Sequence, residues 1–113
     1  MRSARWFTDE FTWSAPEKKI ARRAFEQAYQ RKCGEIAAEV KKLVTSHSTP
    51  SSLWQIHDYL SEQRKTVDEI FDYRYSVLIS VFGYLLREGW LKEADLIGLR
   101  ADKLEKIKGW ANF

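Results

Sequence analysis

The residues best suited to chemistry or recognition gather between Thr49 and Tyr75. Trp54, His57, Asp58 and Arg64 occur there within about three helical turns. When successive residues are set 100° apart, as in an α-helix, three apolar residues share a narrow arc that predicts a buried face: Leu53, Ile56 and Leu60. Trp54 falls more than a quarter-turn from that arc, and His57 and Arg64 flank it. A surface that carries Trp, His, Asp and Arg is typical of protein recognition.

Catalysis is not expected from these residues. His57 and Asp58 lack a nucleophile at a plausible position, because Ser61 has no evident activating base or oxyanion hole. The chain has two histidines and one cysteine, and their positions match no usual metal-ligand spacing. No glycine-rich phosphate loop is present either. We therefore expect a binding protein without catalytic activity, metal or cofactor.

The composition indicates one domain, residues 1–113, with a modest core. Hydrophobic residues make up 44% of the chain, which argues against disorder. The net charge of +3 is spread among 19 basic and 16 acidic residues, so a dedicated nucleic-acid binder is not indicated. One cysteine and the absence of a long apolar run predict a cytoplasmic protein with no transmembrane segment.

The elements that position the site are predicted to be all α-helical. An irregular aromatic arm, residues 1–12, precedes a long helix over 14–46 that opens with a Ser14–Glu17 capping box. Apolar residues recur along that helix for about 30 residues, or ~45 Å. A helix this long overhangs a compact monomer, whose radius of gyration would be about 13 Å. The exposed stripe predicts a homodimer.

The rest of the chain is predicted to form a short motif helix over 50–64, a central apolar helix over 66–88 and a small head of C-terminal helices over 91–108. Thr66 and Glu69 are predicted to form a second capping box, which places a break near Lys65. On the central helix, Phe82 belongs to the apolar stripe. Arg74 falls in the middle of that stripe, so we expect a buried structural ion pair with Asp58 or Asp68.

Several motifs resemble the fluorescence recovery protein family. The central one, W-x-x-H-D-Y-L-S-x-x-R, begins at Trp54 and ends at Arg64. It is followed by D-x-R-x-S from Asp72 and by F-x-x-L-L-x-E-G from Phe82. Weaker matches begin at Trp13, Ala28 and Ala101, so the likeness covers nearly the whole chain from Trp13 onward.

The resemblance implies a small all-α homodimer with an extended stalk and a helical head. Such a protein would bind the C-terminal domain of the photoactivated orange carotenoid protein, speed its return to the orange state and help release it from the phycobilisome. It would be no enzyme, carry no cofactor and meet the thylakoid membrane only through its partner. The family's active residues map onto Trp54, His57, Asp58 and Arg64, and weaker head contacts map onto Phe82 and Lys106.

This chain departs from the family pattern in two places. The arm before Trp13 is longer and more aromatic, and Ser80 stands where an aromatic residue is expected. These departures suggest a divergent homologue with a different protein partner as one alternative. A DNA-binding or other regulatory helical dimer is another, suggested by a basic cluster at Lys18, Lys19, Arg22 and Arg23.

Overall fold

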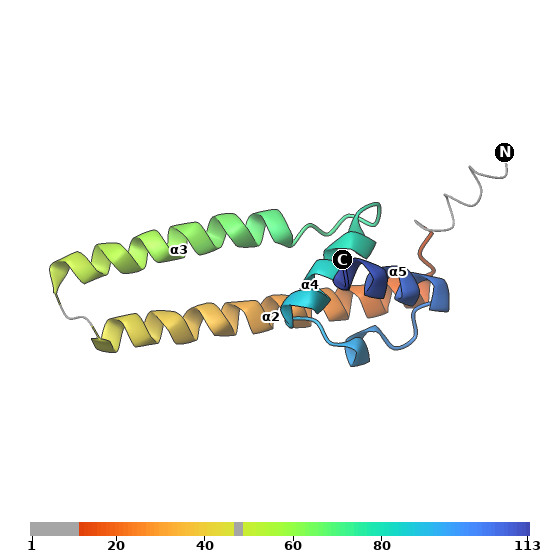
Figure 1. Ribbon diagram of the computed structural model, residues 1–113, viewed down its shortest axis with the longest axis horizontal. Helices are drawn as coiled ribbons and strands as arrows, with labels where there is room; N and C mark the ends of the chain where they lie inside the picture. The colour runs from red at the N-terminus through yellow and green to blue at the C-terminus, as the bar shows by residue number, and fades with distance from the viewer. Residues whose placement is uncertain (1–11, 47–48) are drawn as a thin grey trace.

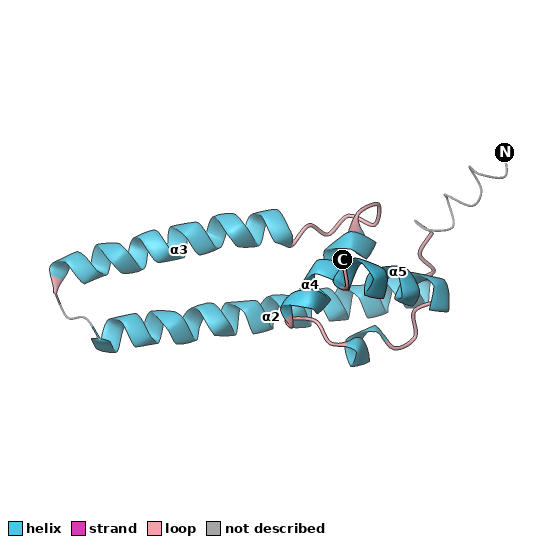
Figure 2. Cartoon of the chain, viewed as in Figure 1, coloured by secondary structure: helices cyan, strands magenta, loops and turns pink. Residues whose placement is uncertain are grey.

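The computed structural model describes residues 12–46 and 49–113, and all regular structure in those ranges is helical (Figure 2). The elements, in chain order, are α2 (Ala15–Ser46), α3 (Pro50–Ile70), α4 (Leu78–Glu88), the 3₁₀-helix η1 (Glu93–Leu96) and α5 (Ala101–Ala111). No strand occurs among the described residues, and the all-α class is confirmed. The predicted arm lies outside these residues except for Thr12.

The molecule is elongated. Helices α2 and α3 run antiparallel as a long hairpin, and α4, η1 and α5 cluster at one end of it (Figure 1). The principal dimensions are 63 × 26 × 25 Å and the radius of gyration is 17.6 Å, well above that of a compact chain of this length. The hairpin forms the predicted stalk and the cluster forms the predicted head.

Helix α2 matches its prediction closely. The Ser14 backbone N–H donates to Glu17 Oε1 at 3.1 Å, and the Glu17 N–H donates back to Ser14 Oγ at 3.3 Å. This capping box satisfies two amides that would otherwise lack partners at the helix start. The helix continues without interruption through Gly34 and ends at Ser46.

The predicted break near Lys65 is wrong. A single helix, α3, spans both the predicted short helix and the first turn of the predicted 66–88 helix. Val67 lies eleven residues, or three turns, after Ile56, so continuing the helix keeps both residues on one side of α3, and Val67 is buried there. Tertiary packing therefore outweighs the local capping signal at Thr66.

A non-helical segment, residues 71–77, separates α3 from α4. Two of its rings pack edge-on against Phe25 of α2, with centroid distances of 5.5 Å for Phe71 and 4.9 Å for Tyr73. The predicted central helix is therefore shortened to α4, which begins at Leu78.

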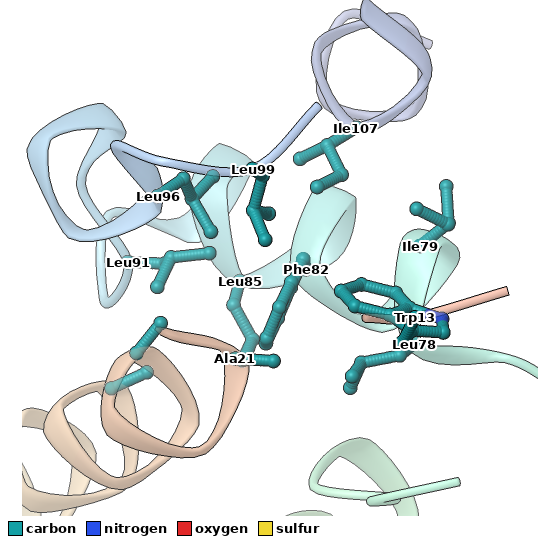
Figure 3. Close-up of a cluster of buried hydrophobic side chains, with 12 residues drawn as sticks. Trp13, Ala21, Leu78, Ile79, Phe82, Leu85, Leu91, Leu96, Leu99 and Ile107 are labelled. Atoms are coloured by element: carbon teal, nitrogen blue, oxygen red, sulfur yellow. The ribbon is translucent and has the colours of Figure 1, made fainter. Parts of the chain in front are cut away.

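The hydrophobic core lies in the head (Figure 3). Phe82 and Leu85 of α4 are fully buried in a cluster that also contains residues from the start of the hairpin and from the rest of the head: Trp13, Ala21, Leu91, Leu96, Leu99 and Ile107. Helices α4 and α5 cross at Gly83, where a Cβ atom would collide with Trp110 and would lie 3.1 Å from the Ile107 carbonyl oxygen. The core therefore fixes α5 against α4 and α2.

Two glycines end head segments as left-handed residues. Gly89 (φ 87°) terminates α4 as predicted, and Gly98 (φ 106°) separates η1 from α5. The predicted C-terminal helices appear as η1 and α5, and α5 extends to Ala111, past the expected end at 108. Arg31 anchors this region to α2, because it donates to Asp95 at 2.7 Å and to the Trp90 carbonyl at 2.8 Å.

Candidate partner-binding site

Helix α3 carries the four predicted site residues on one side. Measured around the helix, Trp54, His57, Asp58 and Arg64 lie within an arc of about 120°. Trp54 is 67% exposed, and the side chains of His57, Asp58 and Arg64 are 68%, 82% and 80% exposed. We call this set the motif face.

The contacts within the motif face are local to α3. The Trp54 and His57 rings meet edge-on with centroids 6.3 Å apart, and His57 Nδ1 lies 3.4 Å from Asp58 Oδ1. Arg64 Nε donates to Asp68 Oδ2 at 3.3 Å, one turn further along. Exposed pairs of this kind contribute little to stability. These side chains are therefore available for contacts with another molecule.

The predicted buried arc of α3 is only partly buried. Leu53 is 64% exposed and Leu60 is 42% exposed, while Ile56 is half-buried. The buried residues of α3 are instead Ser52 and Val67, which are 4% and 7% exposed. The prediction located the apolar arc correctly but assigned it to the interior, because a helical wheel does not show which part of an apolar arc faces the neighbouring helix.

The two sides of the hairpin differ in character. On one side, burial raises the pKa of the Tyr59 phenol of α3, and the nearby negative charges of Glu39 and Glu35 on α2 raise it further. On the other side, Tyr29 of α2 lies near the positive charge of Arg64 of α3. Tyr29 is 44% exposed.

The side with Tyr29 exposes apolar groups from both helices. Tyr29 and Val44 belong to α2, whereas Leu53 and Leu60 belong to α3, and each is at least 42% exposed. We call this surface the apolar side of the hairpin. It borders the motif face, because Leu60 and Arg64 are neighbours one turn apart on α3.

The two predicted head contacts differ in accessibility. Phe82 is 0% exposed, so the prediction that it contacts the partner is wrong. Its position in the apolar stripe explains its burial in the core. Lys106 is half-buried and lines a groove on α5 with Gly109, Trp110 and Phe113. Trp110 is 50% exposed and Phe113 is 95% exposed, so aromatic groups that could meet a partner lie beside Lys106.

Ser80, where an aromatic residue was expected, is half-buried in α4. Its hydroxyl donates to the Val77 carbonyl at 2.8 Å, within the first turn of the helix. The Ser80 hydroxyl therefore has its hydrogen-bond partner in the backbone at the start of its own helix.

Arg74 is not the buried residue that was predicted. Its side chain is 67% exposed and bonds Asp72 at 2.6 Å, rather than Asp58 or Asp68. The hydrogen bond from Arg74 lowers the pKa of Asp72. The prediction failed because it extended helical geometry through residues 71–77, which are not helical.

A buried ion pair in the head was missed. Lys103 Nζ lies 3.2 Å from Glu17 Oε1, and the Arg100 N–H donates to Glu17 Oε2 at 3.0 Å. Burial alone would raise the pKa of Glu17, but the hydrogen bonds from Arg100, Ser14 and Lys103 outweigh it and lower the pKa. Lys103 lies midway between Leu99 and Ile107 at helical spacing, and that pattern could have revealed its burial.

Within residues 12–46 and 49–113, no group of three His, Cys, Asp or Glu side chains is arranged to hold a metal ion. No helix of the described chain combines the length and apolar character needed to cross a membrane.

Comparisons with known proteins agree with this geometry. A family model described as photoprotection regulator fluorescence recovery protein matches residues 13–111. The fluorescence recovery protein of Synechocystis sp. PCC 6803 is 39% identical over 106 residues, which cover 94% of this chain and 97% of that protein.

Solved structures show the same arrangement. The fluorescence recovery protein of Fremyella diplosiphon is 36% identical and superposes with a TM-score of 0.82, covering 90% of this chain and 100% of that one. A Synechocystis variant in which one arginine is replaced by lysine is 37% identical with a TM-score of 0.83 and the same coverage, 90% and 100%.

Proposed function

The chain belongs to the fluorescence recovery protein family of photoprotection regulators, and on that premise we propose that it acts on the orange carotenoid protein. It binds the C-terminal domain of the photoactivated form, accelerates the return to the resting orange state and promotes release from the phycobilisome. The role needs no catalytic chemistry and no cofactor. The protein works in the cytoplasm as a single domain and approaches the thylakoid membrane through its partner.

One observation carries this proposal: the family match covers the chain that builds the motif face, and that face is exposed. Trp54 offers a large aromatic surface, and Arg64 offers a planar guanidinium that can bind a carboxylate with two parallel hydrogen bonds. Aromatic and arginine side chains dominate the binding energy of protein interfaces.

The mechanism is differential binding. A regulator can speed a conformational return only if it binds the closing transition state more tightly than the open, activated partner. It must also bind the closed product weakly, or it would remain attached and turn over slowly. The motif face therefore recognises groups of the partner that are accessible in the open form and are covered after closure.

We further propose a homodimer that pairs the apolar sides of two hairpins. Tyr29, Val44, Leu53 and Leu60 are exposed there in a single chain. Two antiparallel helices from each copy would form a four-helix bundle along the stalk, which is a common way to cover such a surface. Arg64 would then lie at the edge of the dimer contact, beside the partner-binding face.

The test is the dark recovery of the orange carotenoid protein. Purified partner is converted to its activated form by a light pulse, and its absorbance is followed in the dark with increasing amounts of this protein. We expect recovery to accelerate with concentration at substoichiometric amounts. Recovery that is unaffected even at equimolar protein would overturn the proposal.

A further inference from the structure

A second charged surface lies at the head end of the hairpin and is not part of the motif face. It is an open groove of about 520 Å³, lined by Lys18, Lys19, Arg22, Arg23, Glu26 and Tyr75. All but Tyr75 belong to the first turns of α2, at the head end of the hairpin (Figure 1). We call this surface the basic groove.

Aromatic rings hold one row of its cations in place. Lys18 Nζ lies 5.2 Å from the centroid of the Tyr75 ring, and the Arg22 guanidinium lies 4.0 Å from that of Tyr73. These two rings contact each other at 5.4 Å, and Tyr73 also packs on Phe25. Cation–π contacts of this kind restrict long side chains, so less conformational entropy is lost when they bind a ligand.

Within the part of the chain that the structure describes, the charge of the basic groove is not neutralised by ion pairs. Among the described residues, none of its four cations lies within ion-pair distance of a carboxylate, although Glu26 is part of the lining. Arg31, Arg64 and Arg74, by contrast, each pair with an aspartate. Like charges one helical turn apart repel, so this cluster reduces the stability of the helix. A ligand with negative charge would remove that penalty.

We propose that the basic groove binds an acidic segment of the protein partner and so provides a second contact in addition to the motif face. The inference rests on the proposed function. The cations form two rows, Lys18 with Arg22 and Lys19 with Arg23, and within each row they are four residues apart, about 6 Å along the helix. The matching ligand carries carboxylates about one helical turn apart, and the arginines can hold them with paired hydrogen bonds.

The surroundings favour a protein segment over a membrane surface. A helix that lies on a lipid surface inserts apolar side chains beside its basic ones. The most exposed large apolar side chains in the described chain are those of Leu53, Trp54, Ile97 and Phe113, and none of them lines the basic groove. The groove is also confined to two turns of α2, whereas nucleic-acid binders present a longer basic stripe.

The experiment measures the affinity of the full chain for the light-activated orange carotenoid protein. The groove variant carries Lys18→Glu and Arg22→Glu. A control with the same charge change carries Lys41→Glu and Lys42→Glu, at the opposite, exposed end of α2. A third variant, Lys19→Gln with Arg23→Gln, alters cations for which no ring contact is found in the described chain, so a change in ring packing cannot explain its effect.

At low salt we expect the groove variant to lose about tenfold or more in affinity and the control to lose less than about twofold. The third variant should lie between them, and about 0.5 M NaCl should reduce the difference between wild type and groove variant. Equal affinity of wild type and the groove variants would overturn the inference but leave the proposed function intact. Failure of the wild type to bind would overturn both.

Two other results would assign the basic groove to a different occupant. Loss of the dimer on a sizing column, in groove variants but not in the control, would mean that a second copy of the chain fills it. Loss of sedimentation with phosphatidylglycerol vesicles, with partner affinity unchanged, would mean that the groove binds anionic lipid. Either result contradicts the inference.

Discussion

The Lys103 ammonium donates to the Glu17 carboxylate across 3.2 Å, and these side chains are only 1% and 5% exposed. The pair joins the first turn of α2 to the first turn of α5, and Lys103 also lies 5.1 Å from the Trp13 ring centroid. Because the amides of Ser14 and Arg100 also donate to Glu17, one carboxylate links the start of α2 to the start of α5.

Removing one member of this pair should destabilise the head. We expect Glu17→Gln to lower the free energy of unfolding at pH 7 by about 3 kcal/mol, since it leaves the Lys103 charge buried without its partner. Glu93→Gln is the control, because it changes an exposed pair with Lys108 and should cost less than about 0.5 kcal/mol. Urea unfolding followed by circular dichroism measures both. Equal losses of stability in the two variants would contradict the assignment of Glu17 and Lys103 as a buried ion pair.

The same pair predicts a pH dependence. The pKa of Glu17 is lowered from its ordinary value of 4.5, so its contribution is fully present above that value and is lost as pH falls through the folded-state pKa. The difference in stability between wild type and Glu17→Gln should therefore shrink as the pH is lowered below 4.5. A difference that stays constant down to the acid unfolding limit would show that Glu17 does not titrate in this way.

The crossing of α4 and α5 requires a glycine. We expect Gly83→Ala to destabilise the protein by about 1–3 kcal/mol, because the added Cβ meets Trp110 and the α5 backbone. Gly34→Ala makes the same change at a helical site with open space around it, and should stabilise by up to about 1 kcal/mol. Urea unfolding again provides the measurement, and the account fails if the two variants shift stability in the same direction.

The proposed dimer contact can be tested with one charge. Leu60→Glu places a carboxylate on the apolar side of the hairpin, so we expect the mass in solution to fall to that of one chain, 13.4 kDa. Ile97→Glu makes the same change at an exposed head position and should leave the mass unaltered. Light scattering at micromolar concentration distinguishes these outcomes. A Leu60→Glu protein with twice the single-chain mass would place the contact elsewhere.

Features specified by local sequence could be predicted accurately. The Ser14–Glu17 capping box fixed the start of α2, and Gly89 fixed the end of α4, because both act through hydrogen bonds within a few residues. The motif face could also be located, since Trp54 and Arg64 depend only on the geometry of one helix. Its exposure followed from the wheel.

Features that depend on packing between elements could not be predicted from the sequence. Whether the helix breaks near Lys65 depends on packing that buries Val67, and that burial cannot be read from a capping motif. The error at Arg74 followed from it, because a helical wheel assigns no meaningful direction to a residue in a non-helical segment. Phe82 illustrates the opposite case: apolar periodicity placed it in the core correctly, whereas resemblance to other proteins suggested a contact surface.

The central claim is that the motif face drives the partner's recovery, and Arg64→Lys tests it most directly. Lysine keeps the positive charge but cannot make two parallel hydrogen bonds to a carboxylate. The measurement is the dark recovery absorbance of the orange carotenoid protein after a light pulse, with wild type or variant added, alongside a sizing column. We predict recovery slowed at least severalfold relative to wild type while the dimer remains intact. Wild-type recovery rates with an intact dimer would contradict the account.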